Sequence, residues 1–131
     1  MGRNRMIVLD TCGLLWLVQG SGELSDETRQ RIDAEPIVGV SPISAYEIAL
    51  KHRAGKLQLP LLPEEWWTAA LRNHRLEEIT LTADILMSAT RLPPIHRDPA
   101  DRFIIATALQ HNAAVVTADT RFSEYGVRTL L

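Results

Sequence analysis

The 131-residue sequence has a single cysteine, Cys12, and no long apolar run. One cysteine cannot form an internal disulfide, and no second cysteine is available for a zinc cluster. No apolar stretch approaches the roughly 18 residues that a membrane-spanning helix needs. The apolar residues between the basic segment 1–5 and Asp10 are too few for a secretory signal. We therefore expect a cytoplasmic protein with no membrane partner, consisting of one domain over residues 6–131 and a basic, flexible N-terminal extension.

The balance of charges is weakly acidic. Lysine and arginine number 14 and aspartate and glutamate 16, for a net charge of −2. Because sequence-independent binding to nucleic acid is dominated by clustered lysine and arginine on phosphates, this balance argues against a broad electrostatic grip on nucleic acid. A catalytic site made of several acids would lower the total while basic groups elsewhere still held a phosphate backbone. Both interpretations remain open at this point.

Strand-like and helix-like segments alternate along the whole chain. Short apolar segments predict strands, while helical spacing, caps and first-turn prolines predict helices. The strands are expected at 6–9, 37–40, 78–81, 114–117 and, as a possible fifth, 127–130; the helices are expected at 13–18, 25–34, 42–53, 63–71, 82–91 and 98–110. This alternation is typical of an α/β fold with a mainly parallel sheet of four to five strands and helices on both faces.

Four acids lie at related positions in this pattern. Asp10 and Asp119 each come just after a predicted strand, and Glu47 and Asp101 lie in the early turns of helices that follow such a sheet edge. Because ligands bind at the carboxyl ends of parallel strands, all four side chains could converge on one cleft. Oxygen ligands of this kind suit hard cations such as Mg²⁺ or Mn²⁺. The sequence therefore indicates a divalent-cation site, in which metal ions orient water and stabilise the leaving oxygen of a phosphodiester.

Three of these four acids also have an ordinary structural interpretation, whereas Asp101, just before the apolar core of its helix, is harder to explain in this way. Asp10 could cap the helix that follows it, and Asp98 is expected to cap its helix in the same way. Glu47 could form an ion pair with Lys51, four residues further on. Asp119 could serve only the turn that follows the fourth strand. Acids at four related positions are harder to explain as independent caps and turns, so the cation site is the preferred interpretation.

The order and spacing of several motifs resemble those of PIN-domain ribonucleases, specifically the VapC-type toxins of bacterial toxin–antitoxin pairs. The motifs are Val8-Leu9-Asp10-Thr11 followed by Leu14-Leu15-Trp16, then 41–49 with Glu47, Gly55-Lys56-Leu57, 96–106 with Asp98 and Asp101, and Val116-Thr117-Ala118-Asp119. The resemblance covers nearly the whole chain from Met6 onward. It implies a PIN-like three-layer α/β/α fold around the central sheet.

The resemblance also implies an activity and a set of roles. It implies a metal-dependent endoribonuclease in which Asp10, Glu47, Asp101 and Asp119 surround Mg²⁺ or Mn²⁺, with Thr11, Ser44, Asp98 and Thr117 as accessory residues. RNA would be the substrate, and an antitoxin protein the partner, in a homodimer or a toxin–antitoxin hetero-oligomer. The sequence departs from the family pattern at Ala100 and at Thr120-Arg121, which bears on the geometry around the fourth acid.

The remaining polar residues receive weaker assignments. Basic residues that flank the acidic segments are candidates, as a group, for holding RNA phosphates, and a solvated surface role is the alternative for each of them: Lys51, Arg53, Lys56, Arg97 and Arg102. The scattered histidines are expected to have surface or packing roles: His52, His74, His96 and His111. Two alternatives to a nuclease stay open. One is an inactive PIN-like binding module, and the other is a receiver-like signalling domain, although the acidic pair and late lysine typical of receivers are absent.

Overall fold

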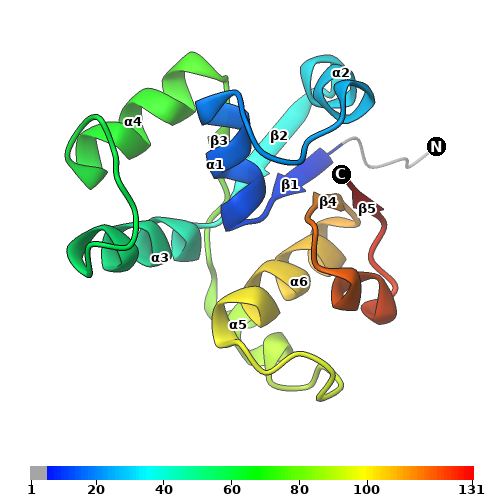
Figure 1. The fold of residues 1–131 in the computed structure, drawn as a ribbon. Helices are drawn as coiled ribbons and strands as arrows, with labels where there is room; N and C mark the ends of the chain where they lie inside the picture. Colours follow the sequence, from blue (N-terminus) through cyan, green and yellow to red (C-terminus); the bar gives the residue numbers. More distant parts are fainter. Residues whose placement is uncertain (1–5) are drawn as a thin grey trace.

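The computed structural model describes residues 6–131, which form a sheet between layers of helices (Figure 1). In chain order the elements are β1 (Met6–Leu9), α1 (Thr11–Gln19), α2 (Asp26–Ala34), β2 (Ile37–Val40), α3 (Pro42–Arg53), α4 (Pro63–Asn73), β3 (Glu77–Glu78), α5 (Ala83–Ala89), α6 (Pro99–His111), β4 (Ala114–Val116), the 3-10 helix η1 (Thr120–Tyr125) and β5 (Thr129–Leu130). The predicted N-terminal extension lies outside the described residues. Within residues 6–131, no helix is both long and apolar enough to cross a membrane.

The five strands pair in the order β3-β2-β1-β4-β5, and every pairing is parallel. Leu9, the last residue of β1, pairs with Val40 of β2 and Val116 of β4. The register therefore brings the carboxyl ends of the three central strands to the same edge, and the Asp10 N–H donates to the Val116 carbonyl at 3.1 Å. The predicted mainly parallel sheet of four to five strands is confirmed.

The pleat of β1 explains both the layers and the apolar run that predicted this strand. Ile7 and Leu9 belong to a core cluster with residues of α1, α2, α3 and α4. Val8 points to the opposite face, where it joins Ile104 and Ile105 of α6. A strand that is buried on both faces has no polar alternation, which is why its sequence is continuously apolar. Figure 1 shows α1 and α6 on either side of the central strands.

The third strand is shorter than predicted. The expected segment 78–81 forms a strand only over Glu77–Glu78, at the edge of the sheet. Ile79 still donates its N–H to the Val40 carbonyl at 2.8 Å, but its side chain turns into the core over Gly39. A Cβ at Gly39 would lie 2.4 Å from the Cδ1 atom of Ile79, so the packing of Ile79 requires glycine at this position.

Several other boundaries differ from the prediction by one or two residues. The first helix begins at Thr11 rather than near Gly13, because the Asp10 side chain caps it. The helix predicted over 82–91 ends at Ala89, and Thr82 is its cap. Between β4 and β5 the chain forms η1, which the sequence pattern did not predict.

Candidate functional site

The four predicted acids line one pocket of about 430 Å³ at the carboxyl ends of β1 and β4. Asp10, Glu47, Asp101 and Asp119 come from four separate segments, and Asp98 lines the same pocket. The other lining residues are Thr11, Cys12, Trp16, Glu23, Lys51 and Ala118. The convergence expected from the strand ends therefore occurs, although it does not by itself assign a role to any of the acids.

Asp10 combines a capping role with a place in the pocket. Its Oδ1 atom accepts a hydrogen bond from the Gly13 N–H at 2.7 Å, which fixes the carboxylate at the start of α1. Burial raises the pKa of Asp10, and the charges of Asp119 and Glu47 add to this, while hydrogen bonds from Thr117 and Gly13 act in the opposite direction. The cap and the pocket are thus compatible functions of one side chain, which is 7% exposed.

Glu47 is held by the hydroxyl of Thr11, which Ser44 contacts in turn, rather than by a lysine. The Thr11 hydroxyl donates to Oε1 of Glu47, and the Oγ atoms of Thr11 and Ser44 lie 2.9 Å apart. Thr11 and Ser44 are both buried, so the chain of hydroxyls is fixed by the packing of α1 against α3. Among the described residues, Glu47 makes no ion pair with Lys51, so the predicted pair at this spacing is absent.

The start of α6 brings two further carboxylates to the pocket. Asp98 caps the helix, as predicted, by accepting the Ala100 N–H at 3.1 Å. Burial is the main cause that raises the pKa of Asp101 to about 7, and the charges of Asp98, Glu47 and Asp10 raise it further. Crowded carboxylates of this kind favour protonation unless a cation neutralises them. The donor set, made of carboxylate and hydroxyl oxygens, fits a hard divalent cation.

Asp119 has a different environment from the other acids. Its Oδ1 atom accepts the Arg121 N–H and Nε–H at 2.9 and 3.0 Å, and its Oδ2 atom lies 2.8 Å from Nη2 of Arg121. Oδ2 is also 2.8 Å from Nε2 of His96. The Arg121 side chain is the main cause that holds the pKa of Asp119 well below its usual range. Asp119 caps η1 in this way, as the turn interpretation predicted, and remains at the margin of the pocket.

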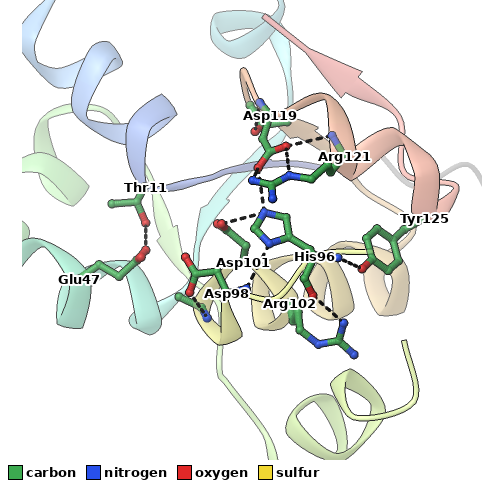
Figure 2. Close-up of polar contacts among 11 residues, drawn as sticks. Thr11, Glu47, His96, Asp98, Asp101, Arg102, Asp119, Arg121 and Tyr125 are labelled. Carbon is green, nitrogen blue, oxygen red and sulfur yellow. Dashed lines mark hydrogen bonds and ion pairs between the residues drawn. The ribbon is translucent and has the colours of Figure 1, made fainter. Parts of the chain in front are cut away.

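The predicted surface or packing roles of the histidines leave out one feature of His96, its contacts with two acids of the site. This side chain is 3% exposed, and its Nε2 atom lies 2.8 Å from Asp119 Oδ2 and 3.1 Å from Asp101 Oδ2 (Figure 2). Its ring also packs edge-on against Phe122, so the packing role is real but incomplete. The one sequence signal was its place two residues before Asp98, within a segment already assigned to the site.

The basic candidates separate into two groups. Arg102 is not available to RNA, because its guanidinium donates to four backbone carbonyls at 2.8 to 3.0 Å, those of Ala89, Leu92, Pro93 and His96. It ties the loop after α5 to the first turn of α6. By contrast, Lys51 lines the pocket, and the other three are exposed: Arg53, Lys56 and Arg97.

Thr117 supports the fourth acid from the backbone side. It is 4% exposed, and its hydroxyl accepts the N–H of Asp119 at 3.0 Å. This contact fixes the turn between β4 and η1. Together with Thr11, Ser44 and Asp98, it completes the accessory residues that the sequence predicted, all of which lie at or next to the pocket.

Comparison with known proteins gives a consistent family. The model of the PIN domain matches residues 7–127. The chain is 30% identical over 120 residues to Ribonuclease VapC22 of Mycobacterium tuberculosis, covering 91% of each protein. A family match over nearly the whole chain, together with a relative of this identity and coverage, is sufficient to assign the chain to a family.

Similar folds occur among solved structures of lower sequence identity. VapBC2 from Rickettsia felis, bound to a DNA fragment from its promoter, has a TM-score of 0.69 at 16% identity, with 95% of this chain and 96% of that chain covered. FitAcB from Neisseria gonorrhoeae has a TM-score of 0.59 at 22% identity, with 96% and 97% covered. A toxin–antitoxin complex from Klebsiella pneumoniae has a TM-score of 0.58 at 20% identity, with 87% of each chain covered. At these identities the likeness shows the fold alone.

Proposed function

Because the chain belongs to the PIN-domain family as a VapC-type member, we propose that it is a Mg²⁺- or Mn²⁺-dependent endoribonuclease and the toxin of a toxin–antitoxin pair. One observation carries the proposal: Asp10, Glu47 and Asp101 meet in one pocket, where burial and mutual repulsion raise the pKa of Asp10 and of Asp101. When its acids are ionised, such a pocket favours the binding of a cation. Family membership argues against the receiver-like alternative.

In this proposal the cation is held by the carboxylates of the four acids that line the pocket, Asp10, Glu47, Asp101 and Asp119. When bound, Mg²⁺ or Mn²⁺ would supply an activated water and neutralise charge on the phosphate oxygens. The protein's own part is to hold these carboxylates in place. Gly13 N–H fixes Asp10, and the Thr11 hydroxyl, which Ser44 contacts in turn, fixes Glu47.

The substrate of the proposed reaction is RNA, and the basic residues around the pocket would hold its phosphates. Lys51 lines the pocket itself, next to the acids. Arg53, Lys56 and Arg97 are exposed, and we propose them as a group for the flanking phosphates. A local cluster of this kind is compatible with the net charge of −2, because the acids of the pocket account for part of the negative total.

An antitoxin partner and a cytoplasmic location belong to the same proposal. The support is that Ribonuclease VapC22 is the relative matched in sequence and that the similar structures include a toxin–antitoxin complex. The protein also exposes large apolar side chains on α3 and the segment after it: Tyr46, Leu50, Leu61 and Leu62. Apolar side chains that gather on a surface often mark contacts between proteins. They suit an antitoxin or a second copy of the chain in a homodimer.

The proposal is tested by incubating a mixed RNA pool with the purified protein in Mg²⁺, in Mn²⁺ and in EDTA. Asp10→Asn and Asp101→Asn remove charge from the pocket with little change in shape. Asp84→Asn is the matched control, because Asp84 is an exposed acid of α5 that does not line the pocket. We expect the first two variants to lose roughly 100-fold or more of the rate, as is typical when electrostatic stabilisation is removed, and the control to behave as the wild type.

The result also decides between the nuclease and the binding module. Cleavage that needs the cation and both acids supports the nuclease. If no cation-dependent cleavage occurs, or if Asp10→Asn and Asp101→Asn cleave as fast as Asp84→Asn, the proposed reaction is wrong and the binding module becomes the better account.

A further inference from the structure

His96 stands between two carboxylates that come from distant parts of the chain. Its Nε2 atom lies 3.1 Å from Oδ2 of Asp101, in the first turn of α6, and 2.8 Å from Oδ2 of Asp119, after β4. Figure 2 shows the imidazole facing both acids, with the Arg121 side chain beside the carboxylate of Asp119. The Nε2 atom makes its hydrogen bond to Asp119 and contacts Asp101 from the same position, so the ring sets the distance between the two carboxylates.

The other ring nitrogen determines which form of the imidazole is present. The backbone N–H of Asp98 points at Nδ1 at 3.3 Å, so Nδ1 accepts a hydrogen bond and carries no hydrogen. The hydrogen of the imidazole is therefore on Nε2, where it faces the two carboxylates. An imidazole that binds a metal through one nitrogen usually donates the hydrogen of its other nitrogen to an acceptor. Here that second nitrogen faces a donor, which is unfavourable for metal ligation through Nε2.

The imidazole is also fixed in orientation by its surroundings. The ring of His96 packs edge-on against Phe122, with centroids 5.8 Å apart and planes at 84°. Its backbone N–H donates to the Tyr125 hydroxyl at 2.7 Å, and its carbonyl accepts from Arg102 at 3.0 Å. A ring that is 3% exposed and anchored at these points cannot turn away without breaking them.

We propose that His96 is a positioning residue for the cation site and not one of its ligands. Its Nε2–H donates to Oδ2 of Asp119 and contacts Oδ2 of Asp101, and it thereby fixes where these two carboxylates lie at the pocket. This inference rests on the proposed function, since it concerns the same site. Losing a hydrogen-bond partner of a ligating carboxylate typically lowers metal affinity by about 10- to 100-fold.

The test compares two amide variants and measures Mn²⁺ binding without RNA, by isothermal titration calorimetry. In His96→Gln the amide nitrogen is as many bonds from the backbone as Nε2, so it can reach both carboxylates. In His96→Asn the amide is one bond shorter and can meet only the Asp98 N–H. We expect His96→Asn to weaken Mn²⁺ binding about 10- to 100-fold and His96→Gln to restore most of it. Thermal unfolding in EDTA checks that both variants fold.

A second measurement needs no variant at all. Pulsed electron paramagnetic resonance on the wild-type protein loaded with Mn²⁺ detects nitrogen bound directly to the ion. We expect no such nitrogen. A directly bound nitrogen would overturn the inference, and so would wild-type affinity in His96→Asn or an equal loss in both amide variants. If the wild type binds no Mn²⁺, the proposed function fails together with the inference. If the wild type binds Mn²⁺ and both His96 variants bind it with the same affinity, the inference alone is overturned.

Discussion

Lowering the pH from 8 to 5 should stabilise the cation-free protein, because the pocket crowds carboxylates that are more easily protonated in the folded state. The pKa of Asp101 is raised from 3.8 to about 7 in the folded chain. Between these two values the folded state binds a proton that the unfolded state does not bind, so stability rises as the pH falls. Above pH 7 both states are charged at this position, and the stabilisation is absent. The raised pKa of Asp10 acts in the same direction.

The size of the effect follows from the shift at Asp101, whose side chain is 23% exposed. Each unit by which the pH falls between the two pKa values raises the free energy of unfolding by about 1.4 kcal/mol. Because protonation of the folded state begins near pH 7 and the unfolded chain is still ionised at pH 5, the free energy of unfolding should increase by about 2 to 3 kcal/mol between pH 8 and pH 5. An effect of this size is a large part of the usual stability of a domain.

Urea unfolding in EDTA at several pH values measures this effect. Asp101→Asn is the matched variant, because it cannot titrate at this position and keeps the same four histidines. Relative to the wild type, the variant should be more stable at pH 8 and should lose that advantage by pH 5. Saturating Mg²⁺ at pH 8 should stabilise the wild type. If the free energy of unfolding of wild type and variant changes equally with pH, the reasoning from crowded carboxylates is refuted.

Two further predictions concern the framework of the site. Arg102→Ala should lower the free energy of unfolding by about 3 kcal/mol, because it leaves four backbone carbonyls without their donor. The control Arg97→Ala removes an exposed side chain and should change the free energy of unfolding by no more than about 0.5 kcal/mol. Similar losses for the two variants in urea unfolding would contradict the structural role of Arg102. Gly22→Ala should destabilise by about 2 kcal/mol or more, because its Cβ would lie 2.1 Å from Cδ1 of Trp16 at a φ of +86°. Gly20→Ala, also at positive φ but with nothing within 4 Å, should cost less, and equal melting temperatures of the two variants would argue against the contact.

The parts of the fold that follow from local pattern were predictable from the sequence. The apolar runs at β1 and β4 identify strands that are buried on both faces, and the caps at Asp10 and Asp98 mark the starts of helices. The third strand was predicted too long, because β-branched Ile79 favours a strand, yet its burial depends on the space that Gly39 leaves. Space of that kind is created by tertiary packing, which a local pattern does not contain.

Some features of the candidate site were likewise predictable from the sequence, and others were not. Acids placed after parallel strands converge by topology, so their meeting in one pocket was predictable. The contacts of His96 and Arg102 could not be predicted, because each joins segments that approach one another only in the folded chain. His96 and Asp119 are separated by 23 residues, and the carbonyls that hold Arg102 belong to an irregular loop. Neither the spacing of apolar residues nor a helix-capping residue identifies such contacts in the sequence.

The central claim is that the acidic pocket holds a divalent cation and uses water to hydrolyse RNA. It is tested most directly by cleaving an RNA pool with Mg²⁺ in water enriched in the heavy oxygen isotope and analysing the product ends by mass spectrometry. Attack by water predicts a terminal monophosphate that carries the heavy isotope and no cyclic phosphate. Unlabelled 2′,3′-cyclic phosphate ends, or cleavage that persists in EDTA, would contradict the account.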